Sequence, residues 1–235
     1  MTNIQPKNQT VFVTATDTDA GKTYVSEKLI KLLVQTGKTV SALKPISAGC
    51  EWHNGELQNE DALCLKAAAN AGQTLSQINP IAFEPPIAPH IAAAQQGDCL
   101  TVPRITSAFV DAQKVPADIC LIEGAGGWRL PLNNQEFLSD FVKNESIPVI
   151  FVVGMKLGCL NHAILTYQAM IQDGIDVIGW IANQAQPEKM RNHQDNVEFL
   201  TSAIDAPFLG ELGFGDSEKN LKQSVILSAL FEKDN

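Results

Sequence analysis

A glycine-rich loop that ends in lysine and threonine is the first segment whose residue types could do chemistry. Residues 15–23 read ATDTDAGKT, between an apolar run at Thr10–Thr14 and a helical pattern at Lys22–Gln35. Strand, loop and helix in this order predict a P-loop, in which backbone N–H groups and the helix N-terminus wrap the phosphates of a nucleotide. Lys22 would then pair with the β- and γ-phosphates, and the Thr23 hydroxyl would bind Mg²⁺.

The loop departs from the usual P-loop spacing in two ways. Five residues separate Ala15 from Gly21 where the standard motif has four, and position 15 is alanine rather than glycine. A plain helix cap beside a surface lysine would be the alternative, but Gly-Lys-Thr between a strand and a helix favours phosphate binding.

Carboxylates that could complete a magnesium site follow two other segments. Four apolar residues, Ile119–Ile122, end in Glu123, as a Walker-B strand ends in an acid. The next residues, 124–127, read GAGG and let the backbone approach a nucleotide closely. Glu123 could instead be a capping or ion-paired acid. Taken alone, Asp61 is more typical of an acid at a helix N-terminus, and Lys44 of a surface lysine.

Apolar runs alternate with helical patterns along the chain, and they predict the elements that position these residues. The predicted strands are Thr10–Thr14, Val40–Leu43, Ile119–Ile122, Val149–Val153, Val177–Ala182 and Phe208–Leu209. The predicted helices are Lys22–Gln35, Ala62–Ala71, Arg104–Gln113, Phe137–Lys143, Leu160–Gln172, Glu188–Ala203 and Lys219–Leu230, and four prolines predict an irregular loop over 79–90. We expect residues 1–235 to form a single α/β domain, P-loop NTPase-like, with a mostly parallel sheet and helices on both faces. Ligands bind beyond the carboxyl ends of such strands.

Composition excludes several classes of protein. The 235 residues are 45% apolar and 18% charged, which argues against disorder, and 17 Lys and Arg against 26 Asp and Glu give a net charge of −9. That charge disfavours nucleic acids and anionic membranes as partners. The polar N-terminus predicts no signal peptide, and the longest apolar run, Val149–Val153, is too short to span a membrane. Five scattered cysteines without a C-x-x-C pair predict reduced thiols and a cytoplasmic protein.

An ordered set of motifs resembles the dethiobiotin synthetase family over residues 10 to about 215. The motifs are TDTxxGKT at 16–23, Lys44-Pro45, Asp61-Ala62, NPxxFxxPxxPH at 79–90, EGAGGWxxPL at 123–132, KLGCLNH at 156–162 and GWxxN at 179–183. The resemblance implies an ATP- and Mg²⁺-dependent ligase that closes a ureido ring on 7,8-diaminononanoate with CO2, in biotin synthesis. One amine would form a carbamate, which attacks the γ-phosphorus of ATP to give a carbamic–phosphoric anhydride, and the second amine would close the ring.

The same resemblance implies the residues of the site. Lys22, Lys44 and Thr18 would be catalytic, and Thr23, Asp61 and Glu123 would bind Mg²⁺. The nucleotide would be bound by Asp19, Ala20, Gly21, Lys22, Thr23, Tyr24, Asp61, Glu123, Gly124, Ala125, Gly126, Asn183, Gln184, Gly213 and Phe214. The diamine would be bound by Thr18, Lys44, Ser47, Gly158, Cys159, Leu160 and Asn161, with the last four holding its distal carboxylate across a homodimer interface.

Three positions depart from the family pattern. The family's serine four residues after the lysine is Ala48 here, and Ser47 precedes it. The usual proline of the loop that flanks the base is Gly213, and an aromatic residue expected near position 196 is Asn196. These exchanges leave open which group contacts the diamine and which nucleotide is preferred.

Two other classes of P-loop protein are alternatives that the sequence disfavours. Switch ATPases of the chromosome-partitioning kind carry an extra lysine early in the loop, where this chain has Thr16 and Asp17. Amide-forming synthetases of the cobyrinic-acid type carry a glutamine-hydrolysing domain, for which 235 residues leave no room. ATP turnover that requires both a diamine and bicarbonate would separate the three.

Overall fold

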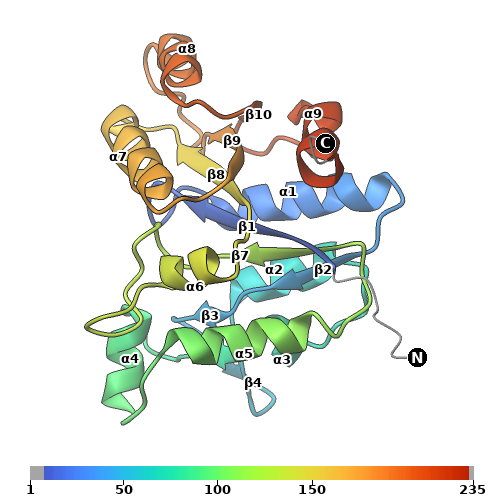
Figure 1. The fold of residues 1–235 in the computed structure, drawn as a ribbon, viewed down its shortest axis with the longest axis vertical. Helices are drawn as coiled ribbons and strands as arrows, with labels where there is room; N and C mark the ends of the chain where they lie inside the picture. The colour runs from blue at the N-terminus through green and yellow to red at the C-terminus, as the bar shows by residue number, and fades with distance from the viewer. Residues whose placement is uncertain (1–7, 233–235) are drawn as a thin grey trace.

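A six-stranded sheet forms the centre of the computed structural model, which describes residues 8–232 (Figure 1). The strands are β1 (Gln9–Ala15), β2 (Val40–Leu43), β7 (Ile119–Glu123), β8 (Val149–Gly154), β9 (Val177–Asn183) and β10 (Phe208–Leu212). Their order is β10-β9-β8-β1-β7-β2, and every neighbouring pair is parallel. The predicted P-loop NTPase-like α/β fold is thereby confirmed.

Helices cover both faces of this sheet. They are α1 (Lys22–Gln35), α2 (Glu60–Ala68), α3 (Leu75–Ile78), α4 (Pro89–Gln95), α5 (Val102–Ala112), α6 (Leu138–Asn144), α7 (Cys159–Gln172), α8 (His193–Ala203) and α9 (Gln223–Phe231). One core lies under α5, α6, α7 and α8, and the other lies under α1, α2 and α9 (Figure 1). No helix among residues 8–232 is both long and apolar enough to cross a membrane.

Strand β1 shows why the strands read as continuous apolar runs. Val11 and Val13 pack into the core under α1, whereas Phe12 between them packs into the opposite core. Successive side chains of a strand point to opposite faces, so a strand covered on both faces needs apolar residues at every position. The same burial holds for all residues of β2, β7 and β8.

Several element boundaries differ from the prediction. The segment 79–90 contains strand β6 (Ile81–Ala82) and the start of α4, where Pro89 fits the first helical turn because its missing N–H is not needed there. The helix predicted from Glu188 begins at His193, after Asn192 in a left-handed conformation (φ 54°). The helix predicted from Lys219 begins at Gln223, because residues 218–220 form a 3₁₀ turn and Leu221 bridges Gly210.

Two small sheets that the sequence did not predict stand beside the carboxyl end of β2. Strand β3 (Ile46–Ser47) pairs with β6, and β4 (Glu51–His53) forms a hairpin with β5 (Glu56–Gln58). Residues 47–48, in and after β3, and residues 86–89, after β6, line the same cavity as the P-loop.

Amide side chains run along the outer side of β2, the last strand of the sheet. The side-chain oxygen of Asn70 accepts the Val40 N–H at 2.7 Å. Gln73 accepts the Ala42 N–H at 2.8 Å and donates to the Ala42 carbonyl at 3.0 Å. Asn79 donates to the Lys44 carbonyl at 2.8 Å. Side chains thus take the place of a neighbouring strand along β2.

Candidate functional site

The P-loop connects β1 to α1 at the carboxyl end of the sheet. Gly21 has φ 84°, a left-handed conformation that favours glycine, and an added Cβ would lie 2.0 Å from the Asn183 side-chain nitrogen. The Thr16 hydroxyl accepts the Gly154 N–H at 3.2 Å, which ties the loop to the end of β8. The loop is therefore held on one side by β8 and on the other by Asn183.

Lys22 lies in the first turn of α1 and is 7% exposed. Its ammonium donates to the Asp17 carbonyl at 3.3 Å, inside the loop that the sequence assigns to phosphates. Burial, and then the positive charge of Lys44, lower the pKa of Lys22 to about 8. A cation that the protein itself leaves underpaired is available to an incoming anion.

Lys44 lies between two carboxylates at the ends of β2 and β7. Its ammonium is 2.5 Å from Glu123 Oε1 and 2.9 Å from Asp61 Oδ2, and it donates to the Gly124 carbonyl at 3.3 Å. Burial opposes its charge, but Glu123 and Asp61 outweigh burial and raise the pKa of Lys44. Lys44 is therefore a buried, permanently charged cation and not the surface lysine that its sequence context alone suggested.

Thr23, Asp61 and Glu123 offer the oxygen ligands that Mg²⁺ prefers. The Thr23 hydroxyl donates to Glu123 Oε1 at 2.9 Å, and Asp61 keeps 42% of its side chain exposed. Glu123 Oε2 is fully buried without a hydrogen-bond partner among residues 8–232. A buried carboxylate oxygen with no partner fits a cation, since leaving such an atom unpaired is costly. No cluster of three or more His, Cys, Asp and Glu side chains suited to a metal occurs within that range, so phosphate and water oxygens would complete the shell.

A cavity of about 880 Å³ opens beside these groups. Ten residues that the sequence assigned to the site line it, namely Thr18, Asp19, Gly21, Lys22, Thr23, Lys44, Ser47, Asp61, Ala125 and Gly126. The structure therefore brings together the P-loop, both lysines and two of the candidate metal ligands. Glu123 lies behind Lys44 and is fully buried.

Other walls of the cavity were not assigned by the sequence. They include residues 86–89, Leu130, Asn59 and the segment 185–186. The signal for 86–89 was present in the motif NPxxFxxPxxPH, whose prolines read only as a loop. Here they form a mostly apolar part of the cavity wall, which suits a ligand with an aliphatic part.

Residues predicted to surround the base lie near one another outside the walls of this cavity. Asn183 is fully buried and donates to the Ala20 carbonyl at 2.8 Å, and Gln184 donates to the Gln186 carbonyl at 2.8 Å. The Tyr24 hydroxyl donates to the Asp216 carbonyl at 2.5 Å and so joins α1 to the loop that contains Gly213 and Phe214. The aromatic ring of Phe214 is 59% exposed.

The residues predicted to hold the distal carboxylate are separate from the cavity within this chain. Gly158 (φ 92°) precedes α7, Cys159 is buried, Leu160 is half-buried and Asn161 is exposed. None of these four residues lines the 880 Å³ cavity.

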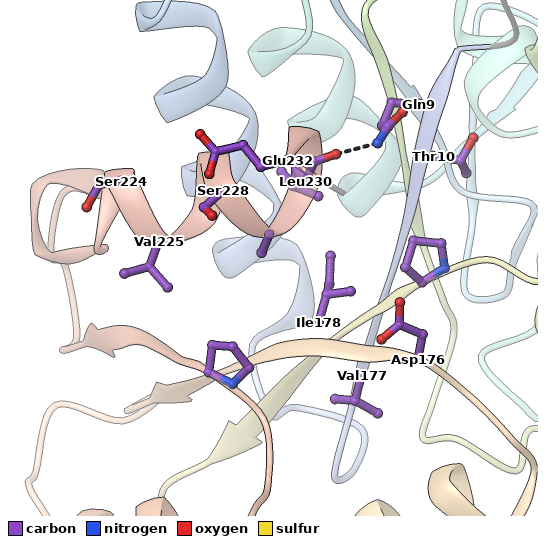
Figure 2. Close-up of a pocket in the computed structure, with 13 residues that line it drawn as sticks. Gln9, Thr10, Asp176, Val177, Ile178, Ser224, Val225, Ser228, Leu230 and Glu232 are labelled. Atoms are coloured by element: carbon purple, nitrogen blue, oxygen red, sulfur yellow. Dashed lines mark hydrogen bonds between the residues drawn. The ribbon is translucent and has the colours of Figure 1, made fainter. Parts of the chain in front are cut away.

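A second and slightly larger cavity, of about 1000 Å³, lies at the opposite end of the sheet. Figure 2 shows it between α9 and the beginnings of β1 and β9, lined by residues such as Gln9, Asp176 and Glu232. Gln9 also donates to the Leu230 carbonyl across it. Among residues 8–232, its walls carry acidic, uncharged polar and apolar side chains and no lysine or arginine. The smaller cavity is therefore the better candidate for binding an anionic nucleotide.

Comparison with known sequences is consistent with this geometry. Residues 9–217 match the family model described as an AAA domain. The chain is 44% identical over 221 residues to the ATP-dependent dethiobiotin synthetase BioD of Aeromonas salmonicida, covering 93% of this chain and 97% of that protein. It is 46% identical over 211 residues to the enzyme of the same name from Pseudoalteromonas translucida, covering 90% and 92%.

Comparison with solved structures supports the fold. The cell division protein FtsY of Thermotoga maritima superposes with a TM-score of 0.50 at 15% identity, covering 98% of this chain and 71% of that one. At this identity the likeness concerns the arrangement of strands and helices only.

Proposed function

This chain belongs to the dethiobiotin synthetase family, and we propose that it converts 7,8-diaminononanoate, CO2 and ATP to dethiobiotin, ADP and phosphate in biotin biosynthesis. The observation that carries the proposal is that Lys22, Lys44, Thr23 and Asp61 line an 880 Å³ cavity that also has an apolar wall, with Glu123 bonded to Lys44 and Thr23. A nucleotide and an aliphatic diamine can be brought together there. Residues 1–235 would act as one domain.

Positive charge is what the first half of the reaction requires. An amine lone pair of the diamine attacks the carbon of CO2, its proton passes to water, and a carbamate anion forms. A carbamate oxygen then attacks the γ-phosphorus, and the bond between that phosphorus and ADP breaks. Two anions must approach each other in this step, and fixed cations lower the barrier to it. Lys22 and Lys44 both line the cavity and supply such cations, and the Thr18 hydroxyl lies beside them.

Magnesium would be held by Thr23, Asp61 and Glu123, and when bound it would neutralise charge on the phosphates. The ADP and ATP phosphates would lie along residues 19–24 and against the backbone of 124–126. The side chains around Asn183, Gln184, Gly213 and Phe214 would flank the base. This nucleotide placement is the part of the proposal that follows the family most closely.

Ring closure requires positioning more than acid–base chemistry. The second amine attacks the carbamoyl carbon of the mixed anhydride, and the carbon–oxygen bond to phosphate breaks, which releases phosphate. Because both amines belong to one molecule, holding the diamine in place gives an effective molarity of about 10⁵ M or more. The apolar wall at 86–89 is suited to hold its aliphatic chain.

The distal carboxylate of the diamine would be held by a second copy of the chain. The start of α7, with Gly158, Cys159, Leu160 and Asn161, presents backbone N–H groups and a positive helix end. These residues do not line the cavity of their own chain, which supports a homodimer with the substrate between subunits. We place the enzyme in the cytoplasm, since its described cysteines are free thiols.

One experiment tests this function directly. The protein is incubated with 7,8-diaminononanoate, bicarbonate and Mg-ATP, and the product mass is measured together with ADP release. We expect dethiobiotin, with ADP formed only when diamine and bicarbonate are both present. ADP release that is independent of the diamine, without dethiobiotin, would contradict the proposal and favour a switch ATPase. Light scattering of the same sample gives the subunit number, for which we expect two.

A further inference from the structure

Asn79 is a buried amide that contacts both substrate-facing residues of the β2–β3 segment. It is 7% exposed and follows α3. Its side-chain nitrogen donates to the Lys44 carbonyl at 2.8 Å and, more weakly, to the Ile81 carbonyl at 3.4 Å. Its side-chain oxygen lies 2.7 Å from the Ser47 hydroxyl.

The orientation of the Asn79 amide is fixed by its partners. A backbone carbonyl can only accept a hydrogen bond, so the two carbonyls of Lys44 and Ile81 require the nitrogen on their side. The amide oxygen must then face Ser47, and it can only accept. Ser47 therefore donates its single hydroxyl proton to Asn79.

Ser47 is left with acceptor capacity only. The Cys50 sulfur lies 3.1 Å from the Ser47 oxygen, and because the hydroxyl proton is already used, the thiol is the donor of that pair. A hydroxyl oxygen accepts through two lone pairs, so one remains. Ser47 is among the residues that line the 880 Å³ cavity, and a ligand that reaches its hydroxyl oxygen meets an acceptor.

We propose that Asn79 is a positioning residue that holds Ser47 as an acceptor, so that Ser47 binds an N–H of the diamine and leaves the nitrogen lone pair free to attack CO2. This inference rests on the function proposed above. A hydroxyl that was free to rotate could instead donate to the amine lone pair. That hydrogen bond would hold the electrons that must form the new nitrogen–carbon bond.

The same geometry predicts selectivity for an amine over a ketone. An amine carries N–H donors for the Ser47 oxygen. A ketone oxygen is only an acceptor, and two acceptors cannot form a hydrogen bond with each other. When a bound ligand leaves a buried acceptor of the site unpaired, it loses more affinity than a ligand that only loses an apolar contact. Analogues of the diamine with a ketone at carbon 7 or at carbon 8 are therefore the probes.

The test compares four variants with the wild type. Asn79→Ala frees the Ser47 proton, Ser47→Ala removes the acceptor, and the double variant Asn79→Ala with Ser47→Ala tests whether the two side chains act on one hydrogen bond. Gln73→Ala is the matched control, because Gln73 is an equally buried amide that binds the backbone of the same strand at Ala42. For each protein, KM and kcat for the diamine, KM for ATP and the inhibition constants of both ketones are measured.

We expect Asn79→Ala and Ser47→Ala to raise KM for the diamine about tenfold and to lower the amine-over-ketone preference about tenfold for one of the two ketones. KM for ATP should stay within about twofold, and Gln73→Ala should keep the wild-type preference. Asn79→Ala and Ser47→Ala should also be non-additive in the double variant, since they act on one hydrogen bond.

Distinct outcomes overturn the inference and the function. An unchanged amine-over-ketone preference in Asn79→Ala and Ser47→Ala would overturn the role of Asn79, as would effects of the two substitutions that simply add in the double variant. If Asn79→Ala does not fold, an unchanged preference in Ser47→Ala overturns the inference. A wild-type protein that turns over no diamine at all would instead refute the proposed function.

Discussion

The Lys44 ammonium lies 2.5 Å from Glu123 Oε1, and Glu123 is fully buried at the end of β7. A lysine expected to face phosphate and a carboxylate expected to bind the metal are thus paired with each other inside the protein. Removing one partner of a buried ion pair leaves the other charge uncompensated, which destabilises a protein by about 3–5 kcal/mol.

The first prediction follows from this pair. We expect Lys44→Met to abolish dethiobiotin formation and to lower the midpoint of thermal unfolding by roughly 6–20 °C. Lys156→Met is the control, because its ion pair with Asp17 is half-exposed at 2.9 Å and is worth at most about 1 kcal/mol. Equal midpoints for the two variants would show that Lys44 and Glu123 do not stabilise the fold as a pair.

Replacing Lys22 should stabilise the fold, whereas replacing Lys44 should destabilise it. Its pKa is lowered to about 8 in the folded protein, so the folded state disfavours its charge. We expect Lys22→Met to abolish turnover yet to raise the free energy of unfolding by about 2–3 kcal/mol at pH 7. Thermal unfolding and turnover, measured on the same preparation, check both halves.

The stability difference between Lys22→Met and the wild type should depend on pH. Between pH 8 and about 10.5 the unfolded chain binds the Lys22 proton and the folded protein does not, so wild-type stability gains from rising pH in that window. The advantage of Lys22→Met should therefore be complete below pH 8 and vanish near pH 10.5. A difference that does not shrink over this range would contradict the lowered pKa.

The P-loop glycine provides a third prediction. Gly21→Ala should raise KM for ATP at least about tenfold, because its Cβ would lie 2.0 Å from the Asn183 side-chain nitrogen and φ is 84°. Gly37 has nearly the same φ, 83°, with no atom within 4 Å of an added Cβ. Gly37→Ala should thus carry the backbone strain alone, with about 1 kcal/mol of lost stability and an unchanged KM for ATP. Similar ATP affinity in both variants would argue against the close approach at Gly21.

The fourth prediction concerns magnesium. Thr23→Val removes a hydroxyl that lies 2.9 Å from Glu123 Oε1, and we expect about tenfold more Mg²⁺ to be needed for half-maximal turnover. Ser26→Ala removes a buried hydroxyl one turn further along α1 and should leave the Mg²⁺ requirement unchanged. Titration of Mg²⁺ at saturating ATP measures both. Chelation of the metal should stop turnover of the wild type.

The sequence predicted the main sheet well because its strands are buried on both faces. Such strands read as unbroken apolar runs, as in β8, and the helices between them carry a clear period. The P-loop could be found because its chemistry depends on neighbours in the chain, with Gly21, Lys22 and Thr23 consecutive.

What the sequence did not predict depends on partners far apart in the chain. Lys44 forms an ion pair with Glu123, which is 79 residues away in the sequence, and nothing near Lys44 in the chain indicates that it is buried. The two-residue strands β3 and β6 are too short to show an alternation of apolar and polar residues. Their pairing nevertheless accompanies a distance of 2.7 Å between the Ser47 hydroxyl oxygen and the Asn79 side-chain oxygen. The apolar wall at 86–89 was hidden for the same reason, since prolines indicate a loop but not what the loop covers.

The amide side chains along β2 have a consequence beyond the reaction. An outermost strand with free N–H and C=O groups can pair with a strand of another molecule and so start aggregation. Asn70, Gln73 and Asn79 occupy such groups on β2, at Val40, Ala42 and Lys44. A crowded solution of this protein thereby loses one template for fibril growth, at the strand that leads directly to Lys44.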